Sequence, residues 1–130
     1  MTEEIEDFSP KEILENKKYI SLTTFKRNGQ GVATPVWFAH HEDKIYMMTK
    51  MDSWKVKRLK RNKAIEMAPC TVRGNIIGEK MKGTARILEK EEAEKAANYL
   101  KRKYKLMYQI STLFGYRKYI ELELTPTGKV

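Results

Sequence analysis

The alternation of apolar and polar positions predicts β-strands along most of the chain. Short runs rich in aromatic and β-branched residues, the composition that favours a strand, recur between turn signals. We expect six strands, at residues 19–25, 32–40, 45–49, 64–70, 79–88 and 119–124. Strands of similar length with helices between some of them indicate a mainly β, α+β fold built as a small barrel.

Two local signals add detail to this sheet. Asn28-Gly29 follows the first strand and is typical of a hairpin turn, because both residues tolerate a positive φ. Pro35 lies inside the second strand. Proline cannot donate a ladder hydrogen bond, so it marks an edge, a bulge or a stretch of backbone that faces something else.

Three helices are expected beside the strands. Ser9 and Glu12 form a capping box around Pro10, so the first helix starts there and runs to about Asn16. A short second helix covers about Trp54 to Asn62. The third, from Glu91 to about Tyr108, follows from an apolar stripe at spacings of three and four, formed by Ala93, Ala97, Leu100, Tyr104 and Met107.

Length and composition narrow the class of protein. The 130 residues suffice for one hydrophobic core, so we expect a single domain over residues 1–130. Cys70 is the only cysteine, which excludes an internal disulfide and a cysteine-based zinc site. No apolar run approaches the roughly 20 residues that span a bilayer, and the acidic N-terminus lacks the layout of a signal peptide. We expect a cytoplasmic protein.

The formal net charge of +9 has two explanations: the protein binds an anionic partner, or the charge only keeps it soluble. The second predicted helix carries the densest basic cluster in the chain, formed by Lys57, Arg58, Lys60, Arg61 and Lys63. A solvated helix face explains this cluster. Nucleic-acid binding, with Trp54 or Trp37 as a stacking partner, also explains it. Of nucleic acid we expect only weak, salt-sensitive and sequence-blind association.

Common catalytic signatures are absent from the sequence. His40 and His41 are adjacent on a strand, so they point to opposite faces and cannot chelate one metal ion together. We find no paired-carboxylate or nucleophile-elbow signature, no phosphate-binding glycine loop and no dinucleotide fingerprint. We assign no catalytic residue and no metal ligand. If the protein is an enzyme, a bound cofactor carries the reaction.

The start of the second helix breaks a local rule. Ser53 is a natural N-cap, yet Lys55 lies in the first turn, where the helix dipole disfavours a cation. A phosphate held by the first amides, the Ser53 hydroxyl and the Lys55 ammonium resolves the conflict. The other interpretation is that Lys55 points into water.

The strand that contains Pro35 is the second unusual segment. Backbone groups near a strand proline are free of ladder bonds, so this edge can hydrogen-bond the polar rim of a planar ring. Trp37 or Phe38 would pack beside that ring. Core packing is the alternative for both aromatic side chains, and one of the two is expected to do only that.

Several segments occur in the order found in a known superfamily. The segments are Thr34-Pro35-Val36-Trp37-Phe38-Ala39, Tyr46-x-x-Thr49, Ser53-x-Lys55-Val56-x-Arg58-Leu59-x-x-Asn62 and Ala68-Pro69-Cys70-x-x-Arg73-Gly74. On these segments the chain resembles the pyridoxamine 5′-phosphate oxidase-like split barrels over roughly residues 17 to 125, and within them the small oxidoreductases that use FMN or the deazaflavin coenzyme F420.

The resemblance implies a six-stranded split barrel that forms a homodimer, with two flavin sites at the subunit interface. It places one strand against the isoalloxazine edge and a second stretch around the cofactor phosphate. Arg73 would make a cross-subunit contact. The implied cofactor-binding residues are Thr34, Pro35, Val36, Trp37, Thr49, Lys50, Ser53, Lys55 and Arg73.

The activity implied by the resemblance is hydride transfer between FMN or coenzyme F420 and a small organic substrate. The longer vitamin B6 oxidases carry a C-terminal arginine-containing substrate motif, whereas this sequence stops at Val130. We therefore do not expect oxidation of pyridoxine phosphate. A non-catalytic flavin carrier and a basic nucleic-acid-binding barrel are the alternative functions.

Overall fold

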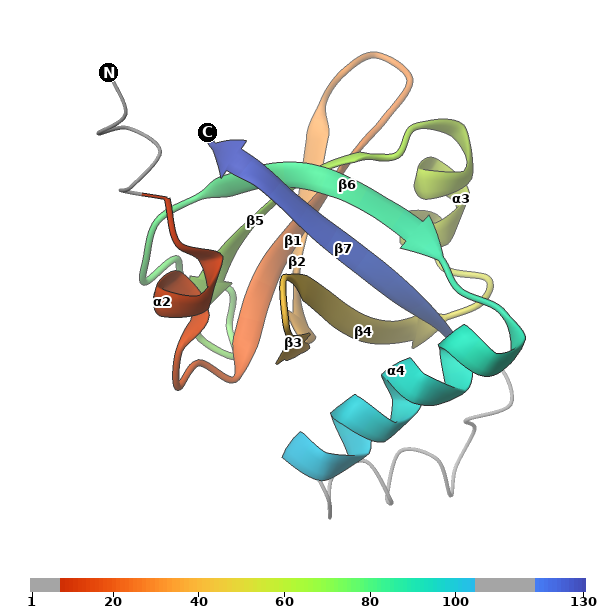
Figure 1. Cartoon of the computed structure of the whole chain (residues 1–130). Coiled ribbons are helices and arrows are strands. Elements are labelled where there is room, and N and C mark those ends of the chain that lie inside the picture. The colour runs from red at the N-terminus through yellow and green to blue at the C-terminus, as the bar shows by residue number, and fades with distance from the viewer. Residues whose placement is uncertain (1–7, 105–118) are drawn as a thin grey trace.

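Seven antiparallel strands form one sheet that curls towards a barrel (Figure 1). The computed structural model describes residues 8–104 and 119–130. Across the sheet the strands follow the order β2-β1-β5-β6-β7-β4-β3, so β2 and β3 are its two edges. Their bounds are β1 Tyr19–Phe25, β2 Gly31–Trp37, β3 Ala39–His41, β4 Lys44–Lys50, β5 Ala64–Cys70, β6 Met81–Ile87 and β7 Tyr119–Lys129.

The expected strand over residues 32–40 is two strands, which corrects the strand count from six to seven. The chain leaves β2, which pairs with β1, and enters β3, which pairs with β4, so it passes from one edge of the sheet to the other. The break falls at Phe38. Its backbone N–H donates to the Tyr104 hydroxyl at 3.1 Å, and its carbonyl accepts from the same hydroxyl at 2.7 Å. A side chain thus satisfies the groups that a ladder would otherwise have used.

The other strand predictions are close to the observed bounds. The first and fourth predicted strands match β1 and β5 residue for residue, and Pro35 lies on an edge strand, as its missing donor requires. The hairpin at Asn28-Gly29 is confirmed by the pairing of Phe25 with Gly31. The predicted end of β7, Leu124, is wrong, because β7 continues to Lys129 beside β6.

A close approach between β6 and β7 explains one glycine of this region. The register between the two strands shifts at Lys82 and Gly83. A Cβ at Gly83 would lie 2.2 Å from the backbone oxygen of Thr125. Only glycine fits there without moving the backbone.

Two of the helices begin where their caps predict, and the third begins one residue before the predicted Glu91. Helix α2 (Pro10–Leu14) has Ser9 as N-cap, and α3 (Trp54–Arg61) has Ser53, each accepting a backbone N–H through its hydroxyl oxygen. Helix α4 (Lys90–Lys103) carries part of the predicted apolar stripe: Leu100 is buried in the helix and Tyr104 is buried at its C-cap, and Ala96 adds to the buried face. The last four residues of that predicted helix, 105–108, lie outside the described residues.

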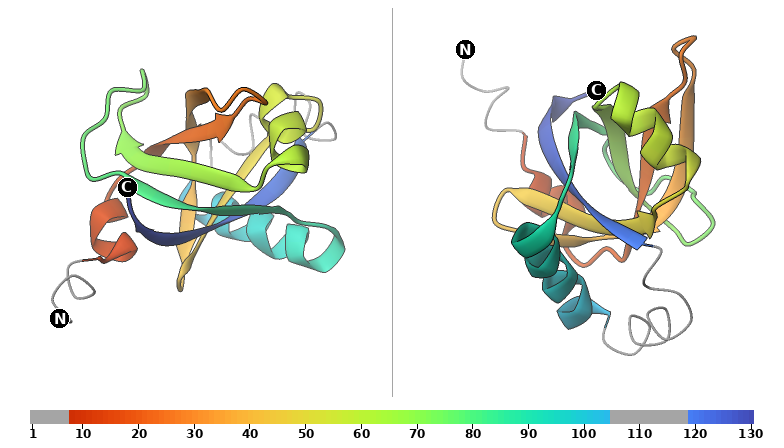
Figure 2. Two further views of the ribbon diagram at one scale, coloured as in Figure 1. Left: turned by 90° about the horizontal axis from the view of Figure 1, so that it is seen from above. Right: turned by 90° about the vertical axis from the view of Figure 1, so that its right-hand side faces the viewer.

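The core fills the inside of the curled sheet. Helix α3 packs against β1, α4 against β3, β4 and β7, and α2 against β5. The views of Figure 2 show α3 and α4 well apart around the sheet. None of the described helices is long and apolar enough to cross a membrane. The largest side chains with almost no exposure are Phe38, Ile20, Leu22, Ile45, Met47, Leu59, Ile65, Met67, Met81, Leu100, Leu122 and Leu124.

Candidate functional site

A pocket lies where the curled sheet fails to close. Strand β3 covers β4 only from Lys44 to Tyr46, and within the described residues no strand pairs with that side of residues 47–50. The outer side of β2 is likewise an open edge. A pocket of about 400 Å³ opens there, lined by Tyr19, Pro35, Val36, Trp37, Met48, Thr49, Lys50, Val72, Leu100 and Tyr119.

The pocket combines apolar walls with a few polar groups. Trp37 stacks on Tyr104 with ring centroids 5.1 Å apart and an interplanar angle of 13°. Tyr104 in turn is held by Phe38 and by the carbonyl of Lys18, so the indole has a fixed support. Thr49 and Lys50 add a hydroxyl and an ammonium. Ligand sites for planar organic molecules are commonly about 300–1,000 Å³ with this mixture of walls.

Five of the residues predicted from the sequence line this pocket together. They come from β2 and β4, which are distant in the chain and meet at the open side of the barrel; the five are Pro35, Val36, Trp37, Thr49 and Lys50. The hydroxyl oxygen of Thr34, next to Pro35, is buried without a hydrogen-bond partner among the described residues. Ser53, Lys55 and Arg73 are not among the lining residues.

The loop between β5 and β6 lies beside the pocket. Val72 lines the pocket, although the residue is 63% exposed to solvent. A Cβ on Gly74 would lie 3.8 Å from the Cδ of Pro35, which places this turn against β2. Arg73 is therefore exposed near the pocket mouth but outside its lining.

Sequence reasoning missed the other lining residues. Tyr19, Met48, Val72, Leu100 and Tyr119 come from five separate elements or loops, and only the pairing order of the strands and the docking of α4 bring them together. One weak signal pointed to Val72, because it lies between Cys70 and Arg73 in a segment that carries the family resemblance.

The start of α3 has the predicted cap and an unusual lysine. The Ser53 hydroxyl oxygen accepts from the Val56 N–H at 3.3 Å. No acidic residue lies in the first turn. Lys55 is half-buried, so it does not simply extend into water. Burial lowers the pKa of Lys55, and the positive charge of Arg58 lowers it further. No ion pair joins Lys55 to a carboxylate within the described residues.

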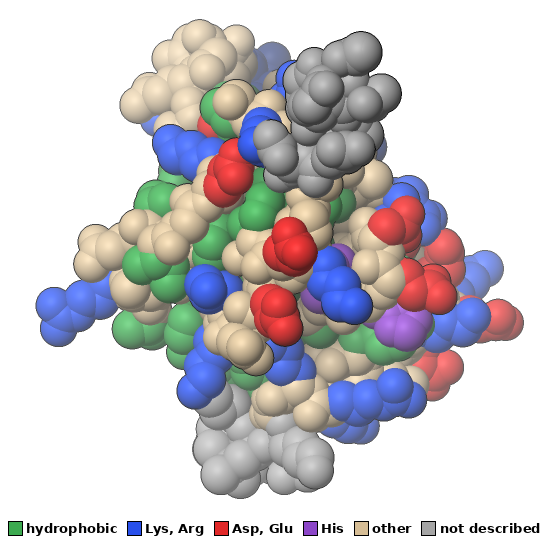
Figure 3. Space-filling model, turned by 60° about the vertical axis from the view of Figure 1, so that its left-hand side comes forward, with side chains coloured by type: hydrophobic (Ala, Val, Ile, Leu, Met, Phe, Trp, Pro, Cys, Tyr) green, Lys and Arg blue, Asp and Glu red, His purple; other side chains and the backbone are tan. Residues whose placement is uncertain are grey.

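The two histidines lie away from this pocket. The His41 ring stacks on Tyr99 with centroids 4.1 Å apart. Burial, followed by the charge of Lys103, lowers the pKa of His40. Figure 3 shows the histidines among both acidic and basic side chains. In the described ranges no three His, Cys, Asp or Glu side chains are placed to hold a metal ion.

Solved structures share this architecture. They include the heme storage protein HutZ from Vibrio cholerae (12% identity, TM-score 0.69, covering 90% of this chain and 87% of that one). A protein described as an F420 reductase has 16% identity and a TM-score of 0.65, with coverage of 91% and 93%. A pyridoxinephosphate oxidase family protein from Clostridium acetobutylicum has 22% identity and a TM-score of 0.61, with coverage of 88% and 79%.

The structural similarity shows that the fold is the split barrel. At these low sequence identities, the activities of the similar proteins do not transfer to this chain. No curated protein matches the chain by sequence. The family model described as pyridoxamine 5′-phosphate oxidase matches residues 1–127, nearly the whole sequence. With the split barrel and the pocket between its open edges, this match shows that the chain belongs to the pyridoxamine 5′-phosphate oxidase family.

Proposed function

We propose that the pocket between β2 and β4 binds FMN or coenzyme F420, and that the protein transfers a hydride between this cofactor and a small organic substrate. One observation carries the proposal. The pocket gathers, from two strands distant in the chain, five residues that the family resemblance assigns to the cofactor. A purely apolar ligand would not account for the polar end of this pocket at Thr49 and Lys50.

The chain offers suitable contacts for the ring system. Trp37, Val36 and Leu100 give flat or apolar surfaces for a planar ring. The open backbone edges of β2 and β4 provide amide and carbonyl groups for the polar rim of the ring. Bound there, the flavin or deazaflavin supplies the hydride chemistry. The protein residues orient the ring and exclude water from one side of it.

We assign the phosphate group of the cofactor to the end of the pocket where Lys50 lies. Lys50 ends β4, and its carbonyl accepts from the Ser53 N–H at 3.1 Å in the turn that leads into α3. Lys55 follows in the first turn of α3 and has no anionic partner among the described residues. A phosphate near this turn would be bound by Lys50, Lys55 and the free amides at the start of α3.

The cofactor assignment is tested on the purified protein. We expect mass spectrometry of the small molecules released on denaturation to identify FMN or F420, and absorbance to show the corresponding band. A stripped protein that binds neither compound on titration, or a Soret band from heme, would contradict the proposal. Turnover of a reduced cofactor with candidate acceptors then separates an oxidoreductase from a non-catalytic carrier.

We also propose that two copies of the chain complete the pocket as a homodimer. Next to the pocket, the β5–β6 loop exposes three aliphatic residues, Val72, Ile76 and Ile77, at 63%, 44% and 52%. Exposed aliphatic clusters of this kind are typical of surfaces that pack against a partner. Light scattering should give the mass of a dimer at micromolar concentration. A monomer that still holds its cofactor would be the contrary result.

A further inference from the structure

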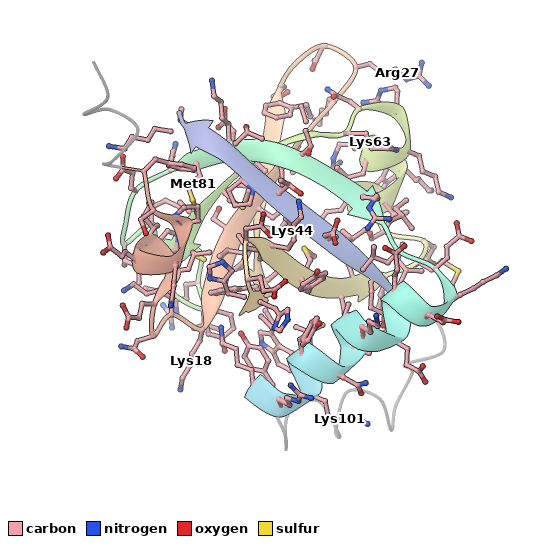
Figure 4. All side chains as sticks on the ribbon, viewed as in Figure 1. Lys18, Arg27, Lys44, Lys63, Met81 and Lys101 are labelled. Atoms are coloured by element: carbon pink, nitrogen blue, oxygen red, sulfur yellow. The ribbon has the colours of Figure 1, made fainter. Side chains whose placement is uncertain are left out.

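A second hollow lies between α3 and the tip of the β1–β2 hairpin. Its described lining consists of four cationic residues and one tryptophan, with no carboxylate among them: Lys26, Arg27, Arg58, Arg61 and Trp54. It shares no residue with the pocket between β2 and β4. Figure 4 shows Arg27 at the hairpin tip, on the side of the molecule that carries Lys63, which lies between α3 and β5. Four cations around one hollow repel one another, so the arrangement favours an anion between them.

Two of the arginines are held in place by strand β1. The Arg58 Nε donates to the Thr24 hydroxyl oxygen at 2.7 Å, and the Arg61 Nη2 donates to the Phe25 carbonyl at 2.8 Å. A guanidinium has five N–H donors, so each arginine keeps donors for a further acceptor. Arginines oriented in advance lose less side-chain entropy when they bind a phosphate than free surface lysines do.

Trp54 adds a different kind of contact. It is 69% exposed, the highest exposure of any large hydrophobic side chain that the structure describes. The Lys57 ammonium lies 4.4 Å from the centroid of its ring, over one face. The other face can stack with a planar ring, and such stacking would remove exposed indole surface from water.

We propose that this hollow binds a nucleotide unit, with its phosphate, and in a single strand also the neighbouring phosphates, on Arg58, Arg61 and the hairpin cations and with the base stacked on Trp54. A single strand or a free nucleotide presents the face of its base, whereas a duplex hides both faces within the stack. Because backbone phosphate and stacking carry the contact, binding is sequence-blind and weakens with salt. The inference does not depend on the cofactor assignment, because the two sites have no residue in common.

The test uses the full chain, a labelled oligothymidylate of about eight nucleotides and thymidine 5′-monophosphate. Binding of the oligonucleotide should fall with a slope of about −3 in log K against log salt, as expected for four phosphate contacts on a single strand. Trp54→Ala should weaken binding on the order of tenfold. Binding of the mononucleotide at a comparable affinity assigns the hollow to free nucleotides, and binding of the oligonucleotide alone assigns it to single strands.

Two double variants distinguish binding at this hollow from nonspecific electrostatic attraction to the positively charged protein. Arg27→Ala/Arg61→Ala should make the salt slope shallower by about 1.4, since two phosphate contacts are lost. Lys95→Ala/Arg102→Ala removes the same charge from α4 and should leave the slope unchanged. Melting curves confirm that all variants fold. Three results would overturn the proposal. They are equal losses in the two double variants, an unaltered affinity in Trp54→Ala, and equally tight binding of polyglutamate, which has no bases.

Discussion

Replacing Lys55 with alanine should weaken the binding of FMN or F420 by roughly ten- to a hundredfold. A charge-assisted contact to a phosphate is worth on the order of 1.5–3 kcal/mol, which corresponds to that loss of affinity. The same change should leave the cofactor-free protein equally stable or slightly more stable. Lys55 is a half-buried cation in the first turn of a helix, close to Arg58 and without an acidic partner in the described chain.

Lys60→Ala is the matched control for this prediction. Lys60 lies on the same helix and is exposed, so its removal changes the charge of α3 by the same amount without touching the start of the helix. The stripped proteins are titrated with FMN and with F420, and their melting curves are recorded without ligand. Equal losses of affinity in both variants would refute a phosphate contact at Lys55. So would a Lys55→Ala protein that melts lower but binds normally, since that result makes Lys55 a structural residue.

Removing a single hydroxyl in Tyr104→Phe should destabilise the protein by about 2 kcal/mol and lower Tm by roughly 6–10 °C. The Tyr104 hydroxyl accepts from the Phe38 N–H and lies within donor distance of two carbonyls, those of Phe38 and Lys18. Tyr104 is only 7% exposed. Phenylalanine would leave the N–H and the carbonyl of Phe38 buried without this partner, which costs more than the hydrogen bonds contribute.

The Tyr104 change should also weaken cofactor binding. The hydroxyl holds the point where the chain crosses from β2 to β3, and the Tyr104 ring supports Trp37 in the pocket wall. Tyr99→Phe is the control, because Tyr99 lies in the helix that Tyr104 caps and stacks on His41, outside the pocket. Thermal melts and cofactor titrations compare the two variants. Equal effects in Tyr104→Phe and Tyr99→Phe would show that the hydrogen bonds between Tyr104 and the Phe38 backbone make no specific contribution to stability or cofactor binding.

Local chemistry in the sequence was enough to determine much of the architecture. Strand β1 was predicted at its observed bounds because aromatic and β-branched residues favour an extended chain whatever lies beside them. Ser9 and Ser53 marked helix starts because an N-cap satisfies amides of its own first turn. Pro35 lacks a donor and so indicated an edge, a bulge or backbone that faces something else, and the structure has it on an edge strand. The family resemblance added the residues of β2 and β4 that meet in the pocket.

Only the tertiary structure decided the rest, because those features depend on partners distant in the chain. Nothing near Phe38 predicts a strand break, since its cause is the hydroxyl of Tyr104, 66 residues away. Beyond Leu124, Thr-Pro-Thr-Gly is typical of a turn, yet these residues continue β7 because β6 pairs with them. The hollow at Trp54 required the β1–β2 hairpin to fold against α3. Hydrogen-bond partners and contacts of this kind are fixed by strand order and helix docking, which local propensity does not encode.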